Sequence, residues 1–228
     1  MLTLNRMRRL EAALRRQGYG PTIEWSENIQ PPADADGFAD QAIYAIINGG
    51  MKATVAGPIH IRCMASLQAS LSATSVFGHP GSKAMAIDQV WSERQRLFDG
   101  YREARDPLVF LVTLPWIGPV LALHLAKLLG HDVAKPDIHL ERLARRDCTT
   151  TAKLCRKLAR QTGYRVATID SILWRACADG LIKSQVYECD GWSAAISAEV
   201  SREAWLPKSG EPTPRPGLAT EPDTSAQA

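Results

Sequence analysis

Apolar residues recur at intervals of three and four positions along most of this chain, the periodicity of helices that bury one face. Residues 3–17 are an example, because Leu4, Met7, Leu10 and Leu14 are separated mainly by arginines and other polar residues. The alternation of β-branched residues that marks strands is almost absent. We therefore expect an all-α protein with short helices over about 3–17, 37–48, 51–72, 82–104, 110–130, 137–147, 150–162 and 165–180.

The composition limits the number of domains and their surroundings. The 228 residues are 45% hydrophobic and 22% charged, enough apolar material for one sizeable core or two small ones. We divide the chain into an N-terminal helix and loop (1–36), a helical domain (37–206) and a Pro- and Ser/Thr-rich tail (207–228) that is expected to be disordered. Neither a membrane-spanning apolar run nor a secretion signal is recognisable, so a cytoplasmic protein is expected.

The cysteines argue against a disulfide framework and against a metal-binding ribbon. Their number is odd and their spacings are wide, unlike the paired cysteines of a zinc ribbon. An iron–sulfur cluster needs four closely spaced cysteines, and only two lie near the C-terminal end. We expect free thiols in a reducing compartment and no iron–sulfur cluster; the five are Cys63, Cys148, Cys155, Cys177 and Cys189.

Positive charge is concentrated in two segments, although the net charge is only +3. Residues 1–20 carry five arginines against a single acid, and residues 131–165 carry nine Lys or Arg against four acids. Clustered positive charge is typical of proteins that bind a polyanion. A solvated helical face is the alternative interpretation.

Two neighbouring segments indicate a more specific function. In the first, residues 111–130, an apolar turn reads Leu-Pro-Trp-Ile-Gly and Pro119 suits the first position of the helix that follows. A tight turn before a helix leaves amide N–H groups directed outward beside the positive end of the helix dipole, where they can bind a phosphate. An ordinary corner between two helices is the alternative.

The second segment, residues 137–147, begins with an aspartate. Asp137 follows a proline and precedes the apolar stripe of Leu140 and Leu143, so it occupies the N-cap position of a helix. Acidic N-caps are common, and a purely structural role is therefore the alternative.

Together the two segments resemble the helix-hairpin-helix DNA glycosylases of the HhH-GPD superfamily. The turn at 114–118 is similar to the family's L-P-G-[IV]-G, with Trp116 in place of the first glycine. The second segment matches the family's D-x-H-h-x-R-h-x-x-R, where h is apolar, through Asp137, His139, Leu140, Arg142, Leu143 and Arg146. The resemblance is sharp over about 107–147 and looser over 37–104 and 150–180. It implies a compact bundle of helices in which two helical subdomains flank a cleft.

The resemblance also assigns a catalytic residue and a DNA wedge. Asp137 would stabilise the oxocarbenium-like sugar as the base leaves and would orient the attacking water. A flipped base leaves a gap in the duplex, which a side chain from the loop after an early helix fills. Asn48, Met51 or Lys52 would supply that wedge here, unless this stretch is a plain helix-breaking turn.

Departures from the family pattern narrow the predicted activity. Members that cut the DNA strand carry a lysine where this chain has Val120, so we expect a monofunctional glycosylase that uses water. Lys127 lies further along the same helix and is predicted to be exposed or to face phosphate. Because Trp116 is not a glycine, its φ is expected to be negative; a positive φ would strain the backbone. The amides of Trp116, Gly118 and Val120 would contact the DNA backbone.

The resemblance suggests roles for several further residues. His139 would brace the helix that holds Asp137, whereas Arg142 and Arg146 would either buttress that helix or reach phosphate. The aromatic candidates for the base pocket, which are equally compatible with the core, are Trp25, Tyr44 and Trp91. The hairpin can bind a monovalent or divalent cation through the carbonyls of Val112, Leu114 and Ile117. No cofactor is required.

We therefore predict a monomeric, nucleoid-associated enzyme of base-excision repair that acts on double-stranded DNA with a modified or mismatched base. Two alternatives are a non-catalytic helix-hairpin-helix DNA-binding protein and an all-α interaction scaffold. The basic segment at 131–165 disfavours the scaffold, and Asp137 disfavours the non-catalytic protein. One sequence does not define the pocket, so the excised base stays open.

Overall fold

The computed structural model describes residues 1–51, 53–77 and 81–201, and over these residues the protein is all-α, as the sequence predicts. No β-strand forms there, and a single antiparallel bridge joins Ile182 and Ile196. The helices are α1 (Leu4–Arg16), α2 (Gly20–Asn28), α3 (Ala35–Asn48), α4 (Ala53–Gln68), α5 (Thr74–Phe77), α6 (Ser82–Ser92), α7 (Arg94–Glu103), α8 (Pro107–Leu111), α9 (Pro119–Leu128), α10 (Ile138–Arg146), α11 (Thr151–Thr162), α12 (Val166–Ala178), α13 (Ser184–Asp190), α14 (Trp192–Ala195) and α15 (Ala198–Ser201).

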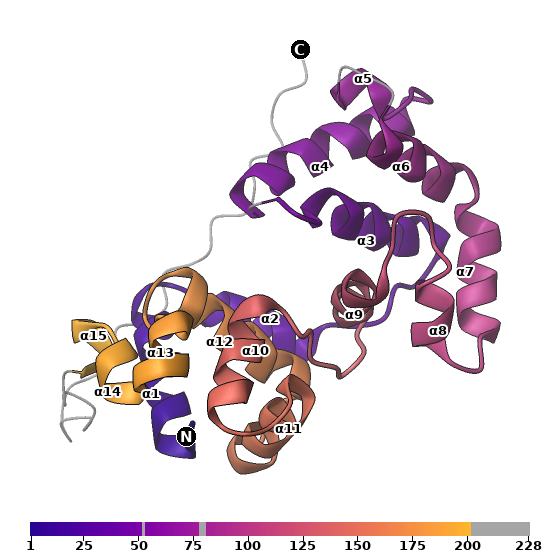
Figure 1. Ribbon diagram of the computed structural model, residues 1–228. Coiled ribbons are helices and arrows are strands. Elements are labelled where there is room, and N and C mark those ends of the chain that lie inside the picture. Colours follow the sequence, from indigo (N-terminus) through magenta and orange to yellow (C-terminus); the bar gives the residue numbers. More distant parts are fainter. Residues whose placement is uncertain (52, 78–80, 202–228) are drawn as a thin grey trace, which may run out of the picture.

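The helices form two lobes, each around its own hydrophobic cluster (Figure 1). Helices α3–α9 make up the first, here called the hairpin lobe. Helices α1, α2 and α10–α15 make up the second, the terminal lobe, so both ends of the described chain contribute to one core. The chain crosses between the lobes twice, at 29–34 and at 129–137. The sequence-based boundary at 36/37 therefore lies close to the first crossing, but residues 1–28 pack with the C-terminal helices.

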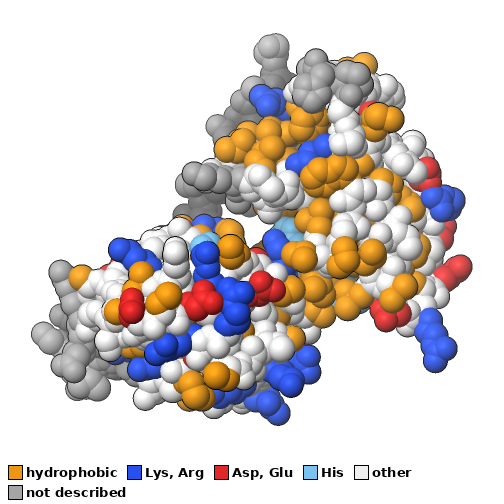
Figure 2. Space-filling view, viewed as in Figure 1, with side chains coloured by type: hydrophobic (Ala, Val, Ile, Leu, Met, Phe, Trp, Pro, Cys, Tyr) orange, Lys and Arg blue, Asp and Glu red, His pale blue; other side chains and the backbone are white. Residues whose placement is uncertain are grey.

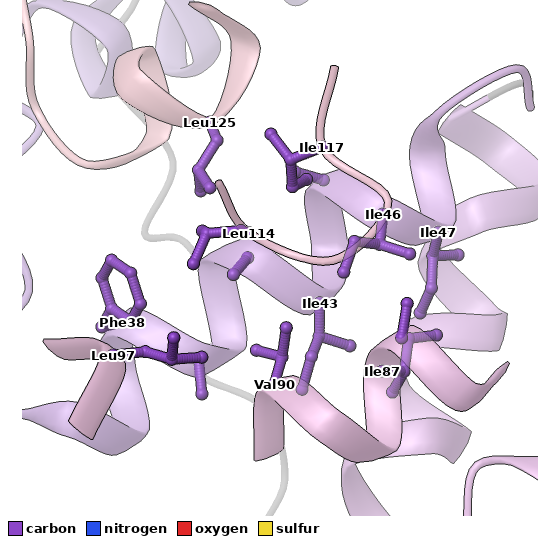
Figure 3. Packing of buried hydrophobic residues seen from close by; sticks show 14 of the residues in the cluster. Phe38, Ile43, Ile46, Ile47, Ile87, Val90, Leu97, Leu114, Ile117 and Leu125 are labelled. Atoms are coloured by element: carbon purple, nitrogen blue, oxygen red, sulfur yellow. The ribbon is translucent and has the colours of Figure 1, made fainter. Parts of the chain in front are cut away.

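Helix α3 is the centre of the hairpin lobe because apolar residues surround much of its circumference. Phe38, Ile43, Ile46 and Ile47 are fully buried. Figure 3 shows them between side chains of α6, α7, α9 and the hairpin turn, among them Ile87, Val90, Leu97, Leu114, Ile117 and Leu125. Asp34 starts the helix by accepting a hydrogen bond from the Gly37 amide at 2.8 Å. This packing fixes the position of the hairpin relative to the end of α3.

Two differences from the predicted helices have simple causes. The stretch after the first helix was expected to be a loop, but it contains α2, with Pro21 in the first turn, where its missing N–H costs nothing. The predicted helix at 82–104 divides at Glu93, whose φ of −99° and ψ of 10° leave the α region. Helices α13–α15 were not anticipated. The predicted tail at 207–228 lies outside the described residues. In the described part of the chain, no helix is long and apolar enough to cross a membrane.

Candidate functional site

Helices α8 and α9 form the helical hairpin that the sequence predicts. Asp106 caps α8 by accepting hydrogen bonds from the Leu108 and Val109 amides at 3.0 and 3.4 Å. Residues 112–118 then reverse the chain, and Gly118 in extended backbone (φ −85°, ψ 174°) precedes α9. The amides of Trp116, Gly118 and Val120 donate no hydrogen bond within the described part of the chain. These residues are exposed, so their amides are available as donors beside the N-terminus of α9, where helix geometry favours an anion.

Trp116 takes the left-handed backbone conformation that glycine adopts most easily. Its φ is +66°, so the strain expected from the sequence is present, at a cost of about 1–3 kcal/mol. The indole is 44% exposed, and the Lys83 ammonium lies 4.7 Å from its ring centroid. A Cβ on Gly49 would lie 3.1 Å from Trp116 Cζ3, which shows how closely the hairpin meets the end of α3.

Asp137 is the N-cap of α10, as predicted, and only one of its two carboxylate oxygens takes part in the cap. Oδ1 accepts hydrogen bonds from the amides of His139 and Leu140, each at 2.9 Å. Oδ2 has no hydrogen-bond partner within the described residues. The cap fixes the side-chain rotamer, which leaves one oxygen directed away from the helix. An Asp in this state can accept a proton from water or face a developing positive charge.

A cavity of about 200 Å³ between the two lobes contains Asp137 in its lining. Its walls come from α2, α3, α9, the 129–137 crossing and α12, and Figure 2 shows the hollow between the lobes with histidine near its opening. This volume is below the roughly 300 Å³ lower bound for drug-sized ligands and suits one heterocycle. The lining residues are Thr22, Trp25, Ser26, Ile29, Tyr44, Asn48, His124, Lys127, Leu128, Lys135, Asp137, Ala167, Asp170, Ser171, Trp174 and Arg175.

Of the three aromatic candidates for the pocket, Trp25 and Tyr44 line this cavity. The Tyr44 ring packs edge-on against His60, with centroids 5.3 Å apart, and Trp25 is 53% exposed. Trp91 is not part of the lining; it is half-buried against the core of the hairpin lobe, and the Arg94 guanidinium lies 4.3 Å from its ring centroid. The sequence missed Trp174, which α12 brings into the lining from the terminal lobe.

The prediction that Lys127 is exposed or faces phosphate is wrong. Its side chain is 14% exposed, lines the cavity and forms an ion pair with Asp170, which is 3% exposed. Burial lowers the pKa of Lys127 to about 8, with Lys135 adding to the shift and Asp137 opposing it. Because α9 packs between the lobes, its lysine meets the aspartate of α12 rather than solvent. The sequence offered one signal of this pairing, because Asp170 is an acidic residue within the apolar stretch of the helix predicted over 165–180.

Asn48 and His124 form a polar pair on another wall of the cavity. Asn48 Nδ2 lies 3.2 Å from His124 Nε2, and both residues line the space that Asp137 faces. Burial, together with Lys135 and Lys127, lowers the pKa of His124 to about 3, so the imidazole is neutral. Asn48 was a candidate wedge. Met51, another candidate, packs against the core of the hairpin lobe, and Lys52 lies outside the described residues.

The predicted supporting residues attach α10 to α13. His139 Nδ1 lies 2.8 Å from Ser184 Oγ. Arg146 donates to the carbonyls of Glu188 and Cys189 at 3.4 and 3.0 Å, and Arg142 Nε lies 3.7 Å from Glu188 Oε2. Both arginines are thus engaged with α13, which favours the buttressing interpretation over phosphate contact.

The carbonyls proposed for a cation belong to the hairpin turn. That of Leu114 accepts a hydrogen bond from the Ile117 amide at 3.1 Å, and the carbonyls of Val112 and Ile117 lie on either side of it along the chain. No group of three or more His, Cys, Asp or Glu side chains suited to a metal forms among the described residues. A cation at the hairpin stays a prediction.

A larger hollow of about 600 Å³ lies on the other side of the 129–137 crossing. It is lined by Asp132, Val133 and Pro136 and by residues of α8–α11, and Asp137 is not among them. Residues of the crossing line both hollows. The smaller one contains Asp137 together with Lys127 and His124. We therefore assign the candidate site to the cavity that contains Asp137.

No family model matches the sequence, and no curated protein matches it significantly. Among solved structures, the chain is similar to the 8-oxoguanine DNA glycosylase of Thermotoga maritima, with 18% identity over 82% of this chain and 97% of that chain and a TM-score of 0.47. A similarity of this size does not assign a family, so the function proposed below is built on the site itself.

Proposed function

We propose that this protein is a DNA glycosylase that everts a modified or mismatched base from a duplex and hydrolyses its N-glycosidic bond. The observation that carries the proposal is the Asp137 carboxylate. One oxygen is fixed by the α10 cap, and the other is available at a base-sized cavity between two lobes. A duplex is the partner that requires such a cavity, because the target bond is inaccessible until the base is swung out.

The hairpin supplies the contact with the DNA backbone. Its three unengaged amides lie at the N-terminus of α9, where the helix dipole favours a phosphate. Trp116 is exposed beside them and offers an apolar surface to the sugar–phosphate chain. Gly49 packs against Trp116, and the preceding residue, Asn48, lines the cavity. A DNA backbone bound at the hairpin would therefore lie next to the cavity that receives the base.

The chemistry follows from charge. As the C1′–N bond breaks, positive charge develops on the deoxyribose, and the carboxylate of Asp137 stabilises it. The same group orients water toward C1′ and takes up the proton released in the attack. Val120, at the position of the family's strand-cutting lysine, has no amine, so the product is an abasic site in an intact strand.

Replacement of Asp137 tests the proposal. Asp137→Asn retains the capping oxygen and removes the negative charge, so we expect base release from a panel of modified duplexes to fall at least 100-fold while duplex affinity changes little. Ser184→Ala is a matched control that alters a contact of the same helix with α13 outside the cavity. Wild-type protein that binds duplex but releases no base would indicate the non-catalytic alternative. Products cut without alkali would refute the monofunctional mechanism.

A further inference from the structure

The cavity contains a buried cation that the proposed function does not use. Lys127 forms its ion pair with Asp170 inside the same 200 Å³ space that Asp137 faces. Asp170 also accepts a hydrogen bond from the Lys135 amide at 3.2 Å, so it ties α9 and the crossing segment to α12. Both charged groups are almost fully removed from solvent. The ammonium is therefore held at a fixed place in the cavity wall.

The position of Lys127 along α9 indicates which part of a nucleotide it would meet. It lies seven residues after Val120, two turns along the same face and about 10 Å further from the hairpin. The cavity is lined only by the second half of α9, through His124, Lys127 and Leu128. If the hairpin amides hold the backbone at the start of α9, a nucleotide that enters the cavity brings its base, not its sugar, to Lys127.

The charge of Lys127 selects among leaving groups. When the bond from C1′ to the nitrogen of a neutral base breaks, the electron pair stays on the base, which departs as an anion. An ammonium beside the base stabilises that charge. An alkylated purine is different, because it is already cationic and departs neutral. Three cations line the cavity (Lys127, Lys135 and Arg175) against the two carboxylates of Asp137 and Asp170, so the lining has an excess of positive charge that disfavours a cationic base.

We propose that Lys127 is a second catalytic residue, which donates a hydrogen bond from its ammonium to the departing base. The substrate is accordingly a neutral base with a carbonyl oxygen or ring nitrogen as acceptor, not a cationic alkylated purine. In the complete step, the base takes the electron pair of the C1′–N bond and then a proton from Lys127. Water adds its oxygen to C1′ and gives its proton to Asp137. Exchange with solvent restores both groups. This inference rests on the proposed glycosylase function.

The neighbours of Lys127 suit a proton donor. Burial brings its pKa to about 8, close enough to neutrality for the proton to be transferred, while Asp170 and Asp137 favour the charged form. His124 is neutral and does not compete. The titratable groups that face Lys127 from the surrounding elements are Asp170, Asp137, Lys135, His124 and Cys155.

The test compares two variants that differ only in the cation. Lys127→Met alone leaves Asp170 buried without its partner, which lowers the stability of the protein. The double variant Lys127→Met/Asp170→Asn removes both charges, whereas Asp170→Asn retains the ammonium. Single-turnover base release is measured at saturating protein on duplexes that contain uracil, mispaired thymine, 8-oxoguanine, 7-methylguanine or 3-methyladenine. Lys183→Met, which removes an exposed lysine just before α13, outside the cavity and outside the basic segment 131–165, is the control for charge.

We expect the wild type to release a neutral base faster than either methylated purine. The double variant should be at least 100-fold slower than Asp170→Asn on that neutral base, and Lys183→Met should stay within about twofold of wild type. Equal rates for the double variant and Asp170→Asn would overturn the inference and leave the glycosylase function intact, as would faster release of the methylated purines by the wild type. Release of no base from any duplex, despite binding, would refute both.

Discussion

The ion pair between Lys127 and Asp170 joins the two lobes, and its contribution to stability can be worked out from its burial. Asp170 is 3% exposed, and if the lysine is replaced, the Lys135 amide is the one hydrogen-bond donor that it keeps among the described residues. Lys127→Met should therefore lower the free energy of unfolding by about 3–5 kcal/mol, the usual cost of leaving a buried charge without its partner. The total free energy of unfolding of a native domain is about 5–15 kcal/mol, so this loss is a large part of it.

The double variant Lys127→Met/Asp170→Asn should recover most of that loss, because neither charge is then left alone in the interior. Urea unfolding, monitored by far-ultraviolet circular dichroism, gives the free energy of unfolding of the wild type, the two single variants and the double variant, which together form a double-mutant cycle. We expect a coupling energy of about 3 kcal/mol, since the two residues are in direct contact. Strictly additive losses would show that the pair does not act as a unit and that the solvent reaches the carboxylate. The reasoning from burial would then be refuted.

Three further predictions concern the cap, the core and the pH profile. Asp137→Ala should lower stability by about 1 kcal/mol, seen as a fall of a few degrees in Tm, whereas Asp137→Asn should lose much less; equal losses would exclude capping through Oδ1. Gly100→Ala should cost about 1–3 kcal/mol in urea unfolding, because its Cβ would lie 2.9 Å from Phe110 Cε2, and an unchanged midpoint would contradict this. Base release should be constant around neutrality and fall above pH about 8, as Lys127 loses its proton, and the variant without Lys127 should not show this limb.

The helices and the hairpin could be predicted because their causes are local. The apolar stripe of α1, the cap of α10 by Asp137 and the turn before Pro119 each depend on residues within a few positions of one another. The all-α class followed from the same patterns. The failure at α2 was also local, because Gly-Pro can end one helix or begin the next, and only packing against α12 decides.

The contents of the cavity could not be predicted, because residues far apart in the sequence meet there. Lys127 and Asp170 are separated by 43 positions, and nothing in either segment reveals the other. A lysine on a helix is usually solvated, so exposure was the reasonable expectation. Trp91 packs against the core of the hairpin lobe, the alternative that the sequence left open, because helical spacing alone does not show whether an aromatic residue faces the core or the cavity.

The two lobes contribute different groups to the candidate site, which explains why the site lies between them. The hairpin lobe presents the backbone amides and Lys127, whereas the terminal lobe fixes Asp137 through α10 and Asp170 through α12. The distance between the carboxylate and the ammonium is therefore set by how the lobes meet, not by either core. Asp132, which accepts a hydrogen bond from the Ala167 amide at 2.9 Å, holds the crossing segment to the start of α12. Because Asp132 itself does not line the cavity, Asp132→Ala should reduce base release by changing this spacing while duplex binding at the hairpin is retained. A parallel loss of both would place the effect in folding instead.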